Sequence, residues 1–251
     1  MQKHTILYDF SKFSPNKNKY FIEIFVFYFV IFVCVPNLKF LISTMYFFKT
    51  PIFLQKIFTS VTWQKDILEK KIYITFDDGP IPEVTEWVLE ELAKYNAKAT
   101  FFCVGENIIK NPSVFEKILA ANHTVANHTH NHFNGWKYAE NTYSDNIITC
   151  AEVLKKYDIS NNLFRPPYGR LTPKQYEILH KNYDIILWSV LSHDYDARLK
   201  SEKCLKKSIE STENGSIIVF HDSQKAKKNL YFVLPKYLAH FHELGFTFEK
   251  L

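Results

Sequence analysis

The sequence predicts an α/β domain in which a mostly parallel sheet is covered by helices. Two observations lead to this prediction. From about residue 71 onward, short runs rich in β-branched and aromatic residues alternate with amphipathic helical runs, and polar clusters recur where the β-rich runs end. Such alternation is typical of a parallel sheet with helical crossovers, either doubly wound or closed as a barrel. The 251 residues are 47% hydrophobic, which is enough for one sizeable core.

About seven β-rich runs are the predicted strands. Each is a short apolar run bounded by turn residues, and the run at 185–190 is expected to be a single buried strand. The predicted strands cover residues 72–76, 99–104, 124–127, 163–164, 185–190, 217–220 and 246–248.

Helices are predicted between most of these strands from apolar spacing and terminal signals. Pro82 stands at the start of a helix that runs to about residue 95 and has apolar residues at i, i+4 spacing. Thr172 and Pro173 form an N-cap and first-turn pair. Ser201 is expected to cap a helix that ends at Gly215. The other predicted helices cover residues 112–121, 143–157 and 229–244.

The first fifty residues form a separate N-terminal extension, which leaves residues 51–251 as one domain. The apolar run at 24–35 is shorter than the roughly 20 residues of a bilayer span. No small-residue cleavage site follows it, which disfavours a cleaved signal peptide. Two interpretations stay open. Either residues 21–42 attach the protein to a membrane or cell envelope, or the segment is not native, translation starts at Met45 and the protein is soluble.

The overall composition excludes some classes of protein. The net charge of +5 is mild and no basic stripe is present, so nucleic acid is not an expected partner. The four cysteines are far apart and form no CxxC pair, so each is expected to be a buried thiol. They are Cys34, Cys103, Cys150 and Cys204. No repeat or second domain is present, and a monomer is the expectation.

Polar clusters follow five of the predicted strands. The carboxyl ends of parallel strands converge on one rim, where ligands bind and catalysis occurs. Each cluster alone could be turn chemistry, but their shared location favours a functional site. The clusters are Asp77-Asp78, His128-Thr129-His130-Asn131-His132, Arg165-Pro166-Pro167-Tyr168-Gly169, Leu191-Ser192-His193-Asp194-Tyr195 and His221-Asp222-Ser223.

Three residues of these clusters predict a metal site. His128 and His132 are four residues apart, which on a helical turn would place both imidazoles on one side, as in HExxH zinc sites. Catalytic zinc usually has three protein ligands, and Asp78 can supply the third. Consecutive residues leaving a strand point in different directions. Asp77 is therefore left for acid–base work, with Arg165 balancing its charge.

The five clusters resemble, in order, the motifs of the polysaccharide deacetylase family, also called NodB-like or carbohydrate esterase family four. The matching segments are TFDDGP, HTHNH, RPPYG, WSVLSHDY and IIVFHDS, within about residues 72–251. The resemblance implies a distorted (β/α)7 barrel and one divalent metal held by Asp-His-His. The implied activity is removal of N-acetyl groups from amino-sugar polymers such as peptidoglycan or chitin-type oligosaccharides.

Carried onto this sequence, the resemblance assigns a role to each residue. It makes Asp77 the general base, held by Arg165, and His221 the general acid, oriented by Asp194. The implied metal ligands are Asp78, His128 and His132, with Zn²⁺ the default ion and Co²⁺, Ni²⁺ or Mn²⁺ as alternatives. The implied substrate-binding residues are Pro167, Tyr168, Gly169 and Tyr195, with the Tyr168 N–H facing the developing oxyanion.

The fourth motif departs from the family pattern D-x-x-D-W. Leu191 replaces its first Asp and Tyr195 replaces its Trp, whereas Asp194 is kept, so activity is expected to survive. The change falls on the groove wall that contacts the sugar. Trp136 and Tyr138 are candidates either for stacking on sugar rings or for packing.

Two alternatives remain at this point. One is a deformylase-like deacylase that uses the same site on a lipid-linked or small N-acylated sugar. The other is a glycan-binding protein of this fold with low activity. The altered fourth motif suggests the second alternative, and the complete set of metal ligands opposes it.

Overall fold

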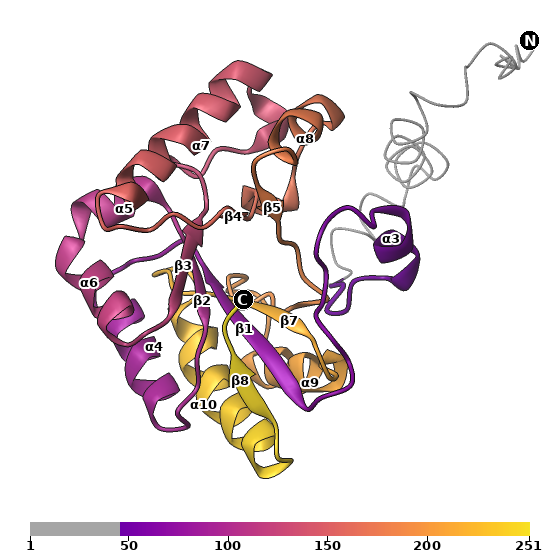
Figure 1. Cartoon of the computed structure of the whole chain (residues 1–251). Helices are drawn as coiled ribbons and strands as arrows, with labels where there is room; N and C mark the ends of the chain where they lie inside the picture. The colour runs from indigo at the N-terminus through magenta and orange to yellow at the C-terminus, as the bar shows by residue number, and fades with distance from the viewer. Residues whose placement is uncertain (1–45) are drawn as a thin grey trace, which may run out of the picture. The chain divides into compact units, whose positions relative to one another are not determined.

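A curled sheet lies at the centre of the protein, with β1 (Lys71–Asp77) in its middle (Figure 1). β1 pairs with β7 (Ile217–His221) along one side and with β8 (Thr247–Glu249) and β2 (Thr100–Cys103) along the other, all in parallel. The seven-strand path runs β5-β4-β3-β2-β1-β7-β6. Its other members are β3 (Thr124–Asn127), β4 (Leu163–Phe164), β5 (Asp184–Ile185) and β6 (Val190–Leu191).

The computed structural model describes residues 46–251. The predicted membrane attachment through residues 21–42, Cys34 and the alternative start at Met45 lie outside the described residues. In the described range, no helix combines the length and apolar character that a bilayer span requires.

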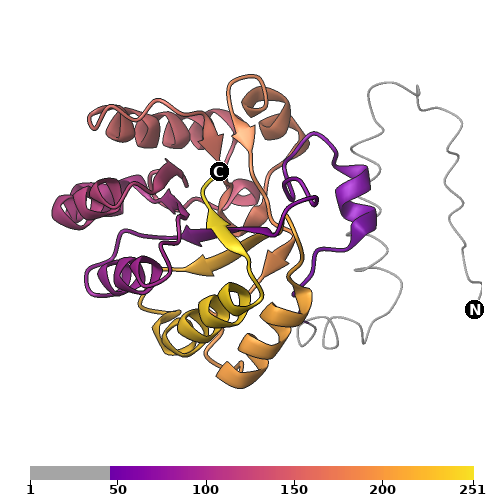
Figure 2. The ribbon, with the colours of Figure 1, turned by 60° about the horizontal axis from the view of Figure 1, so that its bottom comes forward.

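The helices lie around the outside of the curled sheet, which gives the predicted (β/α)7 arrangement (Figure 2). Short helical segments, α3 (Ile52–Ile57), η2 (Gly135–Lys137) and η3 (Pro167–Gly169), lie in the connections. The longer elements are α4 (Val84–Ala93), α5 (Gly105–Lys110), α6 (Pro112–Ala120), α7 (Glu140–Lys155), α8 (Pro173–Leu179), α9 (Ser201–Ser211) and α10 (Lys227–Glu243).

Aromatic rings from three neighbouring strands pack on one face of the sheet. Phe76 is the register partner of both Phe101 and Phe220, and its ring stacks on theirs at centroid distances of 5.0 and 6.1 Å. Side chains alternate along a strand, so Thr75 and Asp77 point to the opposite face. The alternation therefore places the Asp77 carboxylate at the carboxyl end of β1, on the face opposite to the aromatic rings.

Two sequence predictions about elements are wrong. The predicted single strand at 185–190 is divided between β5 and β6, which lie at opposite ends of the strand path. The chain has to cross between these ends, and a continuous strand would not allow that. The helix predicted to be capped by Ser201 and to end at Gly215 has Lys200 at its N-cap position and ends at Ser211. Gly215 lies in a turn with φ of 75°, and a Cβ there would lie 2.5 Å from the Lys65 carbonyl oxygen.

The segment before β1 covers the space between β5 and β6. The Leu191 N–H donates to the Phe48 carbonyl and the Thr50 N–H donates to the Ser189 carbonyl, at 2.9 and 2.8 Å. Farther along, the Thr62 N–H donates to the Ile185 carbonyl at 2.9 Å. Residues 48–62 therefore satisfy backbone groups that two sheet edges would otherwise expose.

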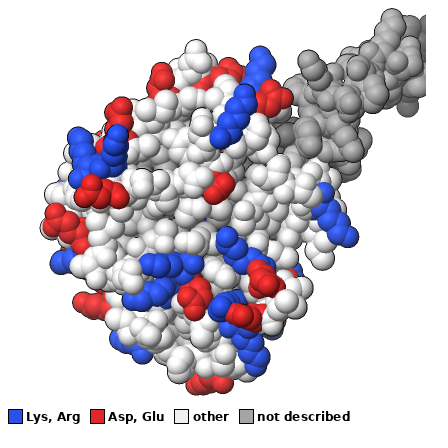
Figure 3. Space-filling model, in the orientation of Figure 1, with Lys and Arg blue, Asp and Glu red and all other residues white. Residues whose placement is uncertain are grey.

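Charged side chains are mixed rather than segregated on the face that Figure 3 draws. Several form i, i+3 or i, i+4 pairs along helices, such as Lys110 with Glu106 at 2.8 Å and Lys207 with Glu210 at 2.7 Å. On this face of residues 46–251 the positive side chains therefore form no continuous stripe (Figure 3).

Replacing Thr172 with Ala tests the helix start predicted from sequence. The Thr172 hydroxyl accepts from the Gln175 N–H, and the Gln175 side chain accepts in return from the Thr172 N–H, at 3.2 and 3.0 Å. We expect Thr172→Ala to lower the free energy of unfolding by about 1 kcal/mol in urea denaturation. Thr149→Ala is the control, because Thr149 is exposed inside α7 and caps nothing there. Equal stability of the two variants would contradict the capping role.

Candidate metal centre and active site

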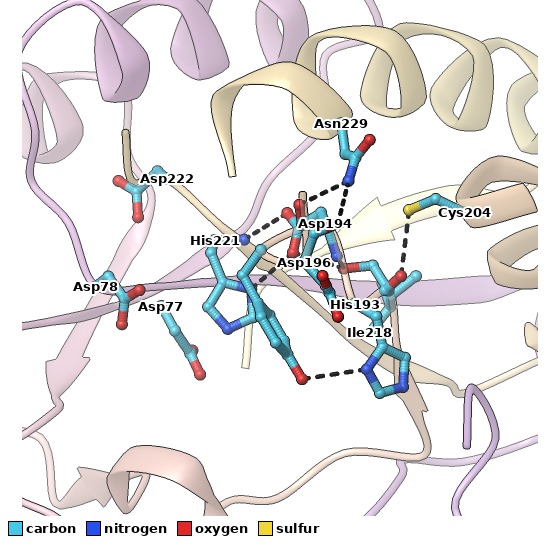
Figure 4. A network of polar contacts seen from close by, with 12 residues as sticks. Asp77, Asp78, His193, Asp194, Asp196, Cys204, Ile218, His221, Asp222 and Asn229 are labelled. Carbon is cyan, nitrogen blue, oxygen red and sulfur yellow. Dashed lines mark hydrogen bonds and ion pairs between the residues drawn. The ribbon is translucent and has the colours of Figure 1, made fainter. Parts of the chain in front are cut away.

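The five polar clusters meet at the carboxyl ends of the parallel strands, as the sequence predicts. Asp77 and His221 are register partners at the ends of β1 and β7. Figure 4 shows Asp77 and Asp78 on one side of His221 and Asp194 on the other. The remaining clusters follow β3, β4 and β6. Asp77 and His221, which are 144 positions apart in the sequence, therefore lie at one site.

Asp78, His128 and His132 form a cluster that could hold a metal ion. One ligand atom from each residue lies within 4.8 Å of the others. Asp78 Oδ1 is 3.1 Å from His132 Nε2 and 3.9 Å from His128 Nε2. Although Asp78 Oδ1 is buried, it accepts no hydrogen bond in the described structure. A buried carboxylate oxygen without a hydrogen-bond donor fits a cation as its missing partner.

The surroundings favour the protonation states that ligands need. Burial lowers the pKa of His128 to about 4, so its imidazole is neutral. Burial alone would raise the pKa of Asp78, but His132, His221 and His128 together hold it well below its usual range. His128 Nδ1 lies 2.7 Å from the Arg165 carbonyl, which can only accept a hydrogen bond. The proton is thus on Nδ1, and the Nε2 lone pair is available.

The two histidines do not lie on a helical turn, so that part of the sequence interpretation is wrong. Residues 128–134 form a loop in which Thr129 and His132 have φ of 65° and 55°. The Asn127 side chain accepts from the Thr129 N–H at 2.9 Å and donates to the Ile147 carbonyl at 2.9 Å. A side-chain-braced loop therefore brings the imidazoles together, with ring centroids 5.2 Å apart.

Arg165 lies next to Asp77, as predicted. Its side chain is fully buried, and Nη1 donates to Asp77 Oδ1 at 2.7 Å and to the Thr75 hydroxyl at 2.6 Å. Nε and Nη2 donate to the Ile186 and Leu187 carbonyls at 3.2 and 3.1 Å. Because four partners surround the guanidinium, the Asp77 carboxylate has a defined position and a balanced charge.

Asp194 lies next to His221, again as predicted. Asp194 Oδ1 is 2.8 Å from His221 Nδ1, and Oδ2 accepts from the His221 backbone N–H at 2.9 Å. Burial opposes protonation of His221, but the Asp194 carboxylate outweighs it and raises the pKa of the imidazole to about 9. The arrangement keeps a protonated imidazole available at neutral pH.

Tyr195 forms part of the wall beside His221. The two rings meet edge to face, with centroids 4.9 Å apart. The Tyr195 hydroxyl is 3.1 Å from His193 Nδ1, and His193 Nε2 is 3.2 Å from the Phe47 carbonyl. Burial lowers the pKa of His193, and a carbonyl can only accept. In the neutral ring Nε2 therefore carries the proton, and the Tyr195 hydroxyl donates to Nδ1.

Of the predicted substrate-binding residues of the third motif, Tyr168 lies next to His132 of the candidate metal cluster. Tyr168 is 58% exposed, and its ring lies 4.8 Å from that of His132. Its φ of 62° is unusual for a residue other than glycine. Pro167 is buried, and Gly169 has φ of 64° and packs against Trp188. These residues shape the backbone that presents Tyr168.

Sequence reasoning assigned no role to Asp222, the second residue of the His221-Asp222-Ser223 cluster. Its fully buried carboxyl accepts from the Gly79 N–H at 3.0 Å and from the Thr85 hydroxyl at 2.6 Å. A Cβ on Gly79 would lie 2.0 Å from Asp222 Oδ2. Burial raises the pKa of Asp222 to about 8, which limits negative charge beside Asp78. The sequence signal for this contact was an aspartate directly after His221 together with a glycine directly after Asp78.

The titration of His221 can be measured directly. We expect its imidazole in metal-free protein to titrate near pH 9 by NMR, and Asp194→Asn to move that transition toward pH 6.5. A raised pKa in the folded state means that this group's contribution to stability is complete below about pH 6.5 and is lost as the pH rises through about 9. Asp145→Asn, an exposed change in α7, is the control. A transition near pH 6.5 in the unmodified protein would contradict the expectation.

Comparisons with known proteins agree with this geometry. A sequence model of the family described as polysaccharide deacetylase matches residues 64–183. A peptidoglycan-N-acetylglucosamine deacetylase of Bacillus cereus is 30% identical over 190 residues, which cover 75% of this chain and 89% of the relative. A chitooligosaccharide deacetylase of Azorhizobium caulinodans is 32% identical over 157 residues, covering 61% and 74% respectively.

The solved structures include the same fold. A crystal structure of a peptidoglycan N-acetylglucosamine deacetylase, in complex with 4-naphthalen-1-yl-N-oxidanyl-benzamide, superimposes with a TM-score of 0.72 at 29% identity. The match covers 76% of this chain and 91% of that one. The chain belongs to the polysaccharide deacetylase family.

Proposed function

We propose that the protein is a metal-dependent hydrolase that removes N-acetyl groups from amino-sugar polymers such as peptidoglycan or chitin-type oligosaccharides. One observation carries the proposal above all others. The ligand atoms of Asp78, His128 and His132 lie within 4.8 Å of one another, beside the carboxylate of Asp77 and the imidazole of His221. Membership of the family and the names of its relatives support the same reaction class.

The three proposed ligands fit a divalent ion, with Zn²⁺ the default for one carboxylate and two imidazoles. Such an ion would polarise the acetamide carbonyl and make water a better nucleophile. Asp78 and His128 are in the ionised and neutral forms, respectively, that ligation needs. Arg165 contributes through its carbonyl, which orients the His128 ring.

Asp77 is the proposed general base. Arg165 holds its Oδ1 at 2.7 Å, while Oδ2 lies 4.0 Å from His128 Nε2 and so faces the ligand cluster. From there it can accept a proton from the water that attacks the acetamide carbon. The Tyr168 N–H has no acceptor in the described structure, and we propose that it donates to the oxygen that becomes negative.

His221 is the proposed general acid. Asp194 is bonded to Nδ1, which leaves the proton on Nε2 for transfer. As the new C–O bond of acetate forms and the C–N bond breaks, His221 donates this proton to the sugar nitrogen. The nitrogen leaves as an amine. Asp77 gains one proton and His221 loses one, so the number of protons on the protein is unchanged.

Assay of the purified chain on several substrates tests the proposal. We expect acetate release from peptidoglycan and chitin oligosaccharides, loss of release with a chelator, and recovery after Zn²⁺ is added. Release only from small or lipid-linked N-acylated sugars, or release of formate, would instead support the deformylase-like alternative. Bound metal with no release from any substrate would support the glycan-binding alternative.

Two neighbouring substitutions separate the base from the ligand. We expect Asp77→Asn to lower kcat by about 10²–10⁴ while metal content is kept, because the amide oxygen can still accept from Arg165 but cannot take a proton. Asp78→Ala should lose both metal and turnover. Metal is measured by mass spectrometry and turnover by amine release. Asp184→Asn, an exposed change in β5, is the control. Near-normal turnover by Asp77→Asn would refute its role as base.

A further inference from the structure

Arg170 lies in the wall of the site on the side of the metal ligands. Its guanidinium carbon is 4.6 Å from the centre of the Trp136 ring and 5.7 Å from that of Tyr168. Tyr168 in turn contacts His132, with ring centroids 4.8 Å apart. A positive charge therefore lies one aromatic ring away from a proposed metal ligand.

This wall is braced by hydrogen bonds. The Trp136 indole N–H donates to the Leu171 carbonyl at 3.2 Å. The side-chain amide of Gln175, which is fully buried, donates to the carbonyls of Gly135 and Tyr138 at 2.8 and 3.1 Å. The loop that carries Trp136 is thus joined to the loop that carries Arg170. By contrast, Tyr138 stacks on Phe133 at 3.8 Å, which is a packing contact.

Lys225 occupies a comparable position on the side of the acid. Its Nζ lies 5.3 Å from the centre of the Tyr195 ring, and that ring contacts His221 at 4.9 Å. The hydroxyl of Tyr195 is in turn held by His193. His132 and His221 therefore have the same surroundings: an aromatic ring contacts each imidazole, and a cation lies near that ring.

Neither cation forms an ion pair with a carboxylate in the chain from residue 46 to 251, and three carboxylates of the site have other partners. Asp77 pairs with Arg165, Asp78 faces the histidines and Asp196 pairs with Arg198 at 2.7 Å. Some surface lysines elsewhere do have a carboxylate partner, as Lys110 does in α5. Two unpaired positive charges thus flank the site, one on each side.

We infer that Arg170 and Lys225 make the site selective for acidic glycans, in which sugars next to the N-acetylated sugar under attack carry carboxylates. This inference rests on the proposed deacetylase function and names its substrate class. The aromatic faces suit sugar rings, and an arginine stacked on an aromatic ring keeps N–H groups for a carboxylate. A polymer with lactyl or peptide carboxylates could contact both the aromatic rings and the cations. A neutral chitin-type chain could contact only the aromatic rings.

Matched substrates and variants test this selectivity. The substrates are peptidoglycan-derived oligosaccharides with free carboxylates, the same oligosaccharides with those carboxylates amidated, and chitin oligosaccharides. We expect the unmodified protein to prefer the free carboxylates at low salt. Arg170→Gln and Lys225→Gln should each raise KM for the acidic substrate by about two- to fivefold, with kcat little changed, as exposed charge pairs contribute modestly. The double variant should lose the preference for free over amidated substrate. In the unmodified protein, 0.5 M salt should reduce that preference.

Lys236→Gln is the control because it also removes a lysine placed against an aromatic ring. Its Nζ lies 3.8 Å from the centre of the Phe232 ring on α10. We expect that variant to keep the full preference. Equal KM values of the unmodified protein for free and amidated substrates would overturn the inference but leave the deacetylase function intact. Absence of acetate release from all three substrates would overturn the proposed function itself.

Discussion

The buried guanidinium of Arg165 is the interaction on which the rest of the site depends. It donates to Asp77 from the end of β4 and to the Ile186 and Leu187 carbonyls, where the chain crosses between the two ends of the sheet. Its own carbonyl accepts from His128. One residue therefore positions a carboxylate, a proposed metal ligand and the crossing segment. Loss of either member of a buried ion pair commonly costs about 3–5 kcal/mol, so this network serves stability as well as chemistry.

Two adjacent carboxylates at the end of a buried strand would repel each other unless each had its own cation. Asp77 has Arg165, whereas the described residues place only imidazoles around Asp78. Asp222 holds the following turn through the Gly79 N–H, with a carboxyl whose burial raises its pKa to about 8. Asp78 thus faces histidines without a lysine or arginine partner within residues 46–251, which is consistent with its proposed role as a ligand of a divalent ion.

The altered fourth motif keeps the hydrogen-bonded pair of Asp194 and His221, the proposed general acid, and changes its surroundings. Asp194 keeps its hydrogen bonds to His221, and Tyr195 packs against the same imidazole. The hydroxyl of Tyr195 adds a contact, through His193, to the segment that enters the domain at Phe47. The wall beside His221 therefore combines the Asp194–His221 pair with an aromatic ring, Tyr195, that has the Lys225 ammonium 5.3 Å from its centre.

The sequence by itself determined the parallel α/β architecture, the capped start of α8 and the rim on which the reactive residues meet. Those features follow from local periodicity, capping and the rule that parallel strands end together. Tertiary structure decided the rest. It divided the run at 185–190 between two sheet edges, shaped the His128–His132 loop without a helix, and joined Asp222 to Gly79. It also placed Arg170 beside Tyr168 and Lys225 beside Tyr195. These outcomes depend on contacts between segments far apart in the chain, and no local pattern encodes the energy of such contacts.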